Sequence, residues 1–269
     1  MNNYRIFLNT YRIIWELVVI GVDNMGMENN IRRVKTGIDG LDEIIEGGLT
    51  KNTVTLISGP PGSGKTIFCN QFLYKGLEEG DTCLFLTLDK KVDSIIDQAK
   101  RIGLDFQPAI EKGQIKFLFL NINKKLVYDD MTKELASGEY NRVVLDSITP
   151  LSERPIYIKD IDLRNDGNFI DSADFPSDDA ASPVRLHLHY IMNVLDMAKC
   201  TSVITSELPM GSFNLSRDGI SEFLVDGIIL LNLDSVMDRR KLSVMKMRST
   251  KHSFKSQDIK IGEGGIQLM

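Results

Sequence analysis

The stretch Gly59-Pro-Pro-Gly-Ser-Gly-Lys65-Thr66 decides the fold class of this chain. It matches the pattern G-x-x-x-x-G-K-[S/T], for which about one chance match in a hundred chains of this length is expected. The apolar run 53–58 before it predicts a buried strand, and the segment from about 65 to 80 after it predicts a helix. A strand, a glycine-rich loop and a helix in this order form a P-loop, which binds the phosphates of a nucleotide.

Each part of the loop has a chemical role. Glycines let backbone N–H groups point at the phosphates, and the helix N-terminus adds positive potential. Lys65 is expected to reach the β- and γ-phosphates, and Thr66 to ligate Mg²⁺. The predicted cofactors are therefore ATP and Mg²⁺. The predicted nucleotide-binding residues are Gly59, Pro60, Pro61, Gly62, Ser63, Gly64, Lys65, Thr66 and Ile67.

A second apolar run, Val143-Val144-Leu145, ends in Asp146. Many strands end in an aspartate, so this pattern alone is weak. Downstream of a P-loop in the same chain, however, it indicates a strand that carries a magnesium ligand. We expect Asp146 to stand on a strand next to that of the P-loop and to hold Mg²⁺, directly or through water.

Strand and helix patterns alternate along the chain, which predicts an α/β fold with a mainly parallel sheet between helices. Further strands are predicted at 83–88, 115–120, 142–145 and 202–205, and helices near 92–99 and 184–198. A short helix near 38–45 is expected to begin with a capping box of Thr36 and Asp39. Three strand patterns, 227–233, 241–247 and 259–268, predict antiparallel strands at the C-terminal edge.

The charge and the cysteine pattern of the chain limit the kinds of partner it can bind and the cellular compartment it can occupy. A net charge of -5 and a pI of about 5.4 give no support for a broad basic face that binds nucleic acid. Cys69, Cys83 and Cys200 lack C-x-x-C spacing, so we interpret them as buried thiols in a reducing compartment. We therefore expect a cytoplasmic protein.

We expect one catalytic domain, 28–269, after an extension, 1–27, that is disordered or not translated. Charged residues interrupt the apolar part of this extension, which makes it unsuited to span a bilayer. An amphipathic helix is an alternative, and Met25 and Met27 are alternative starts to Met1.

The periodicity fails between about 153 and 182. This segment holds eight acidic and three basic residues, so its net charge is -5. Such a composition predicts a long surface loop inserted in the domain. A partner-binding segment is the alternative interpretation.

Four further segments together resemble KaiC-like ATPases of the RecA superfamily, in a single-domain form. They are Thr36-Gly-Ile-Asp-Gly-Leu-Asp42, Gly47-Gly-Leu49, Phe223-Leu-Val-Asp-Gly-Ile-Ile-Leu230 and Lys246-Met-Arg-Ser-Thr-Lys-His252. The resemblance covers about 32–269, with the acidic segment as an insertion. It implies a RecA-like fold, a ring that is usually hexameric, and ATP bound between subunits.

The resemblance also implies roles for single residues. Lys246 and Arg248 take the places of a Lys and an Arg that reach the γ-phosphate of a neighbour's ATP. Thr250 and His252 match positions that help to hold that nucleotide in trans. Glu207 matches a glutamate that senses the γ-phosphate, with a solvent-exposed loop acid as the alternative. Without the resemblance, Lys246 and Arg248 would be interpreted as a solvated strand edge.

The chain departs from the family at one catalytic position. After the second strand the family typically has a Glu-Glu pair that polarises the attacking water, and this chain has Asp89-Lys90. Asp89 keeps a carboxylate on a shorter side chain, whereas Lys90 is a cation. The predicted catalytic residues are thus Lys65, Asp89, Lys246 and Arg248, with slow hydrolysis. Ser249 stands where glycine is usual.

Three functions follow from these patterns. The first is a slowly hydrolysing, KaiC-like regulatory ATPase that works as a homo-oligomeric nucleotide switch. The second is a recombinase-like or recombination-mediator ATPase that binds DNA, which the acidic pI disfavours. The third is an ATP-binding module without turnover. Salt-dependent DNA binding and phosphate release discriminate among them.

Overall fold

The computed structural model describes residues 31–122, 127–153 and 183–269. The predicted extension, the alternative start residues and, apart from Glu153, the predicted acidic insertion lie outside these ranges. The family resemblance near residue 36 and all the predicted site residues lie within them.

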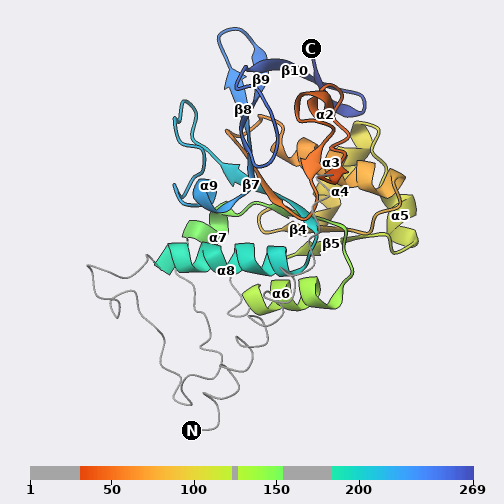
Figure 1. Cartoon of the computed structure of the whole chain (residues 1–269). Coiled ribbons are helices and arrows are strands. Elements are labelled where there is room, and N and C mark those ends of the chain that lie inside the picture. Colours follow the sequence, from red (N-terminus) through yellow and green to blue (C-terminus); the bar gives the residue numbers. More distant parts are fainter. Residues whose placement is uncertain (1–30, 123–126, 154–182) are drawn as a thin grey trace, which may run out of the picture.

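In the described part of the chain, a nine-stranded sheet forms the centre of the molecule (Figure 1). Its order is β11 (Gly265–Leu268), β10 (Gln257–Gly262), β9 (Arg239–Met247), β8 (Gly227–Asp234), β3 (Val54–Gly59), β7 (Thr201–Glu207), β6 (Arg142–Asp146), β4 (Cys83–Thr87) and β5 (Ile115–Phe119). The strands from β8 to β5 run parallel, and β9, β10 and β11 are antiparallel. The predicted α/β class with an antiparallel C-terminal edge is confirmed. A separate antiparallel pair joins β1 (Arg33–Val34) and β2 (Leu49–Thr50).

Helices cover both faces of the sheet (Figure 1). One face packs against α2 (Leu41–Ile44), α3 (Lys65–Glu78), α4 (Val92–Arg101) and α5 (Gln107–Glu111). The other packs against α6 (Val127–Ser137), α7 (Thr149–Glu153), α8 (Pro183–Met197) and α9 (Ser221–Leu224). The fold therefore has three layers and two hydrophobic cores.

Strand β3 shows how one strand serves both cores. Leu56 packs in the core that contains α8, whereas Ile57 packs in the core that contains α3. Successive residues of a strand point to opposite faces, and every residue of β3 is buried. A strand covered on both faces is held firmly, so the loop that follows Gly59 starts from a fixed position.

Two local predictions are wrong. The backbone N–H and the hydroxyl of Thr36 both donate to Asp42 Oδ1, at 2.9 and 2.8 Å, rather than forming a capping box with Asp39. The box fails because Gly40, in the left-handed conformation, precedes the short helix α2 and leaves Asp39 outside it. The predicted strand 259–268 is the hairpin β10–β11, because Gly264 adopts a φ of 82° and reverses the chain.

A buried arginine fastens the end of α3 to the sheet. Arg142 is 1% exposed, and its guanidinium lies 2.6 Å from both Glu79 Oε2 and Asp81 Oδ2. It also donates to the carbonyls of Lys35 and Phe72, at 2.6 and 2.9 Å. These contacts hold the C-terminal end of α3 against the start of β6.

Replacing this arginine is expected to destabilise the fold. We expect Arg142→Met to lower the free energy of unfolding by about 2–4 kcal/mol, because it strands two carboxylates that are only partly exposed. Urea unfolding followed by circular dichroism measures the change. The exposed Arg101 gives the matched control, since Arg101→Met should change the free energy by less than about 0.5 kcal/mol. An equal effect of both substitutions would contradict this role.

Candidate functional site

The glycine-rich loop joins β3 to α3 as the sequence predicts. Gly62 and Gly64 have φ values of 80° and 107°, a region that favours glycine. A Cβ atom at Gly59 would collide with the carbonyl of Leu231 on β8. Helix α3 begins at Lys65 with no side-chain cap and no acidic residue in its first turn. Its first N–H groups are thus left for an anion.

The Lys65 side chain folds back over its own loop. Its Nζ donates to the carbonyls of Gly59 and Pro60, at 2.8 and 3.1 Å, and the residue is 8% exposed. Burial lowers the pKa of Lys65, and the nearby carboxylates of Glu207 and Asp146 oppose that shift. Among the described residues, the amine therefore has only these neutral carbonyls as hydrogen-bond acceptors.

Asp146 meets the P-loop helix at the carboxyl end of β6. Thr66 Oγ1 donates to Asp146 Oδ2 at 2.7 Å, and Thr205 Oγ1 donates to Oδ1 at 2.5 Å. The prediction that β6 lies next to the P-loop strand is wrong, because β7 runs between β3 and β6. Thr66 spans this gap since it projects from the first turn of α3, which lies over the sheet.

Lys90 also reaches Thr66. Lys90 Nζ donates to Thr66 Oγ1 at 2.8 Å, so a cation stands beside the hydroxyl that contacts Asp146. The root of the Lys90 side chain is fixed by Thr87, the last residue of β4. Thr87 Oγ1 accepts from the Lys90 N–H at 3.3 Å and donates to the Lys90 carbonyl at 3.1 Å.

Asp89 faces the end of β6 from the same turn. Its Oδ2 accepts a hydrogen bond from Ser147 Oγ at 3.3 Å. Burial raises the pKa of Asp89, as do the neighbouring Glu207 and Asp146 carboxylates, while Ser147 and Lys90 act in the opposite direction. Glu207 ends β7, and its backbone N–H donates to Thr149 Oγ1 at 3.0 Å.

Several of these groups line one cavity of about 250 Å³, and Asp89 is not among them. The lining residues come from the P-loop and the start of α3, the turn after β4, α4, and the carboxyl ends of β6 and β7. They are Pro61, Gly62, Gly64, Lys65, Thr66, Ile67, Lys90, Gln98, Asp146 and Glu207. A larger hollow, about 620 Å³, lies between α6 and α8. That hollow lacks a glycine-rich loop and a lysine, so the smaller cavity suits a phosphate group better.

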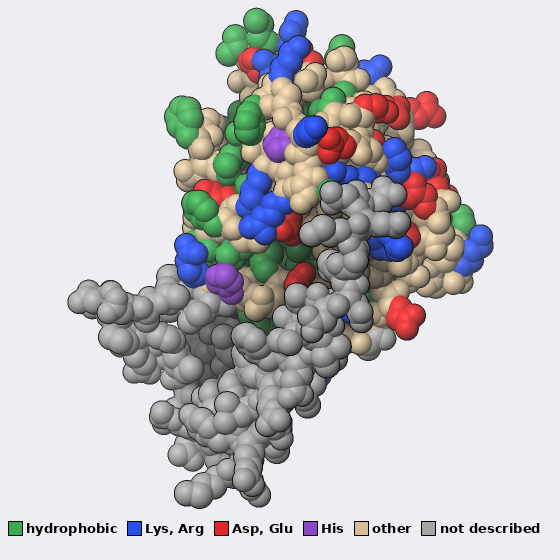
Figure 2. Space-filling view, in the orientation of Figure 1, with side chains coloured by type: hydrophobic (Ala, Val, Ile, Leu, Met, Phe, Trp, Pro, Cys, Tyr) green, Lys and Arg blue, Asp and Glu red, His purple; other side chains and the backbone are tan. Residues whose placement is uncertain are grey.

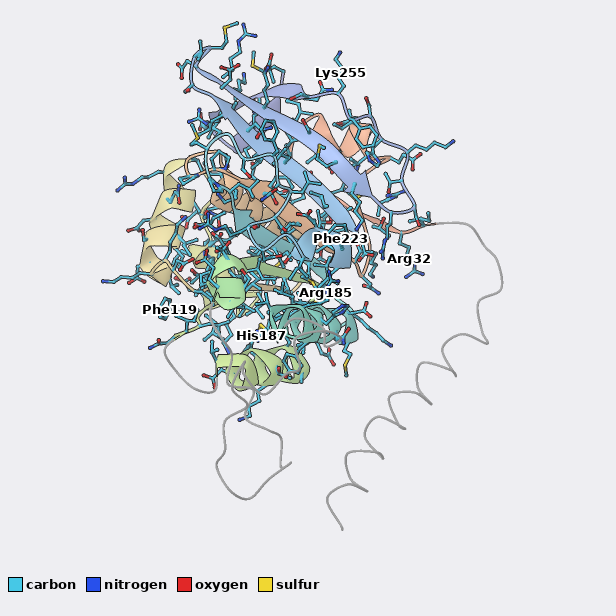
Figure 3. The ribbon with its side chains drawn as sticks, turned by 90° about the vertical axis from the view of Figure 1, so that its left-hand side faces the viewer. Arg32, Phe119, Arg185, His187, Phe223 and Lys255 are labelled. Carbon is cyan, nitrogen blue, oxygen red and sulfur yellow. The ribbon has the colours of Figure 1, made fainter. Side chains whose placement is uncertain are left out.

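The segment 246–252 lies outside this cavity. Lys246 Nζ donates to the carbonyls of Glu222 and Val225, at 3.1 and 2.6 Å. Burial lowers the pKa of Lys246, and Arg248 adds to this shift while Asp226 opposes it. The Arg248 guanidinium donates to Asp226 Oδ1 at 2.9 Å, and its side chain is 60% exposed. Figure 3 shows the labelled Phe223 of α9 beside this part of the sheet.

The remaining two residues of the segment are held by local contacts. Thr250 Oγ1 accepts from Arg33 at 2.5 Å and donates to the carbonyl of Arg248 at 3.1 Å. His252 Nδ1 lies 3.0 Å from the Thr250 carbonyl, and its ring packs edge-on against Phe254. None of these four residues lines the cavity at the chain's own P-loop.

Comparison with known proteins agrees with this arrangement. The family model "ATPase: KaiC" matches residues 34–269. The chain belongs to the KaiC-like ATPase family. It is 32% identical to a UPF0273 protein of Pyrococcus horikoshii, over 87% of this chain and 93% of that protein. It is 30% identical to the circadian clock oscillator protein KaiC 1 of Synechocystis, over 88% of this chain and 44% of that protein.

A solved structure supports the same family. The KaiC-like protein of Pyrococcus horikoshii matches with a TM-score of 0.70 and 31% identity, over 89% of this chain and all of that chain. Among the described residues, no helix has the length and apolar character needed to cross a membrane.

For a KaiC-like ATPase, the donor set at the P-loop has the chemistry of a magnesium site. The Thr66 hydroxyl and the Asp146 carboxylate would hold Mg²⁺, which prefers few protein oxygens together with phosphate and water. The described residues contain no group of three or more His, Cys, Asp or Glu side chains placed to hold a metal. Any Mg²⁺ here therefore depends on the nucleotide for most of its ligands.

Sequence reasoning missed two members of the site. Gln98 lines the cavity from α4, and Thr205 fixes Asp146. Gln98 stands one residue before the buried Ala99, on the polar side of α4. The amphipathic pattern of this helix could therefore have indicated that Gln98 is available to a ligand. Thr205 ends the predicted strand 202–205, but its bond to Asp146 depends on the pairing of β6 with β7.

The geometry around Lys65 predicts the effect of its removal. We expect Lys65→Ala to weaken ATP binding by at least about tenfold, the loss typical of one charged hydrogen bond. Isothermal titration measures the affinity. The control is Lys75→Ala on the same helix, where the half-buried Lys75 pairs with Glu78 at 3.1 Å. Equal ATP affinity in Lys65→Ala and the wild type would refute the site assignment.

Proposed function

We propose that this chain binds ATP at its P-loop and works as a nucleotide switch in a homo-oligomeric ring, with slow hydrolysis. The observation that carries the proposal is the contact of Thr66 with Asp146 beside Lys65, at the wall of one cavity. A hydroxyl, a carboxylate and a buried amine at a helix N-terminus suit a triphosphate with its metal.

ATP binding would exchange the internal contacts of the site for contacts to phosphate. Lys65 bonds two neutral carbonyls, and a phosphate oxygen is a stronger acceptor for an ammonium. The N–H groups of the first turn of α3 would gain an anion. When bound, Mg²⁺ supplies charge neutralisation between the phosphates, with Thr66 and Asp146 as its protein ligands.

The groups around the γ-phosphate position favour slow turnover. Asp89 is the carboxylate on the turn that follows β4, and Glu207 is the second acid near it. A water held by Asp89 would give up its proton to this short side chain as it attacks. Lys90 supplies no base, and its ammonium points at Thr66. We therefore expect hydrolysis at a low rate.

Residues of a neighbouring subunit would complete the site. Lys246, Arg248, Thr250 and His252 do not line the cavity of their own chain, and Arg248 is mostly exposed. The family resemblance assigns these positions to a neighbour's nucleotide. A guanidinium supplied in trans offsets charge on the transferred phosphoryl group. We propose a ring, hexameric as is usual in this family, in which each ATP lies between two subunits.

A second candidate, an ATP-binding module without turnover, is favoured by the contact of Lys90 with Thr66. Phosphate release measured with the ring assembled separates the two functions. DNA binding has less support, since the face drawn in Figure 2 carries acidic and basic side chains interspersed rather than a basic field. We propose a cytoplasmic protein whose partners are other copies of itself and protein clients.

A mixing experiment tests the shared site. Arg248→Ala subunits and Lys65→Ala subunits should each be nearly inactive, because a trans arginine contributes roughly 10³- to 10⁵-fold in rate. In mixed rings, some sites join an intact Arg248 to an intact P-loop. We expect the mixture to release more phosphate than either parent.

The control is a mixture of Arg239→Ala with Lys65→Ala, since Arg239 lies at the exposed start of β9. Arg239→Ala should match the wild type in its own activity. A protein that stays monomeric with ATP, or Arg248→Ala mixtures no more active than their parents despite confirmed subunit exchange, would contradict the shared site.

A further inference from the structure

We propose that Arg33 is a positioning residue for the arginine that each subunit presents to its neighbour's ATP. This role rests on the proposed shared site and adds a residue that acts on it from the N-terminal strand pair. Arg33 lies on β1 and bonds both residues that follow Arg248, namely Ser249 and Thr250. The bond to Thr250 joins positions 217 residues apart in sequence.

The Arg33 guanidinium makes four hydrogen bonds. Its Nη2 donates to the Ser249 carbonyl at 2.9 Å and to Glu46 Oε2 at 3.1 Å. Its Nη1 donates to Thr250 Oγ1 at 2.5 Å and to Thr50 Oγ1 at 3.2 Å. The side chain is only 14% exposed, so the charge depends on these partners. Because a guanidinium is planar and rigid, two of its bonds to one turn fix the backbone of that turn.

The turn that Arg33 holds has a backbone conformation that serine disfavours. Ser249 has a φ of 54°, in the left-handed region. The family resemblance implies a glycine at this position, and glycine takes this conformation without strain. A residue with a side chain stays there only when surrounding contacts compensate, and the bond from Arg33 to the Ser249 carbonyl is such a contact.

This turn sets the direction in which Arg248 leaves the sheet. The Arg248 N–H donates to the Asp226 carbonyl at 3.0 Å, and the Arg248 carbonyl accepts from Thr250 Oγ1 at 3.1 Å. That same hydroxyl accepts from Arg33. The backbone of Arg248 is thus fixed by Asp226 on one side and by Arg33, through Thr250, on the other. Loss of Arg33 would release the second side.

The strand pair β1–β2 keeps Arg33 in place. Arg33 pairs in register with Thr50 of β2. A Cβ atom at Gly48 would collide with the carbonyl of Val34, so the close approach of the chain to β1 requires glycine there. Two segments of the family resemblance, 47–49 and 246–252, are therefore joined through this one arginine.

Phosphate release measured against ATP concentration tests the proposal on the full-length protein. We expect Arg33→Met to lower kcat by about 10- to 100-fold, since misplacing a group by about 1 Å can cost about 10²-fold in rate. KM should change by less than about threefold, because Arg33 does not line the nucleotide cavity. Arg32→Met removes the adjacent exposed arginine, labelled in Figure 3, and should behave as the wild type.

A second substitution tests whether Arg33 acts through the turn. Adding Ser249→Gly should raise the kcat of Arg33→Met at least about fivefold, because glycine adopts the positive φ without strain. Ser253→Gly in the same background is the control, since Ser253 has no positive φ, and it should restore nothing. Arg33→Lys keeps a cation beside Glu46 and should also lower kcat, so the test does not depend on the folding of Arg33→Met.

Mixed rings separate an action on the neighbour from an action on the subunit's own fold. Arg33→Met subunits have an intact P-loop, and Lys65→Ala subunits have an intact Arg33 and Arg248. We expect their mixture to release more phosphate than the average of the two parents.

Equal kcat in Arg33→Met and Arg32→Met would overturn the role of Arg33. A lack of rescue by Ser249→Gly would also overturn it. So would an Arg33→Met mixture that stays at its parents' average while the Arg248→Ala mixture with Lys65→Ala exceeds its own. Failure of both mixtures refutes the shared site itself, and the role of Arg33 with it.

Discussion

The hydrogen bond between Thr66 and Asp146 is the constraint on which the site depends, because it joins residues 80 positions apart in sequence. It forms only if α3 lies over the sheet with its first turn at the carboxyl end of β6. Two buried cores fix that placement, and Arg142 fastens the other end of the same helix. The fold thus serves to bring one hydroxyl within 2.7 Å of one carboxylate.

The charged side chains of the site have hydrogen-bond partners within the site itself. Lys65 bonds the carbonyls of its loop, Asp146 accepts from Thr66 and Thr205, and Lys90 donates to Thr66. A buried charge without a partner is costly, so these contacts keep the protein stable in this form. A nucleotide must replace them rather than fill an unpaired site. Its binding then depends on the difference in strength between the contacts to phosphate and these internal contacts.

Short sequence patterns predicted those parts of the site that lie within one continuous segment of the chain. The P-loop lies in consecutive residues, and the apolar run before Asp146 marks a strand end, so both were predicted. Helix α6 was missed although Val127, Met131 and Leu135 recur at helical spacing. The contact of Lys90 with Thr66 and the partners of Lys246 arise from strand order and helix packing, which no short pattern encodes.

A crystal structure of the protein with a non-hydrolysable ATP analogue and Mg²⁺ tests the central claim most directly. The account predicts a triphosphate in the loop 59–66, with Lys65 released from the Gly59 and Pro60 carbonyls and the metal beside Thr66 and Asp146. A triphosphate bound elsewhere would contradict it. So would a triphosphate in this loop with Lys65 still bonded to the two carbonyls.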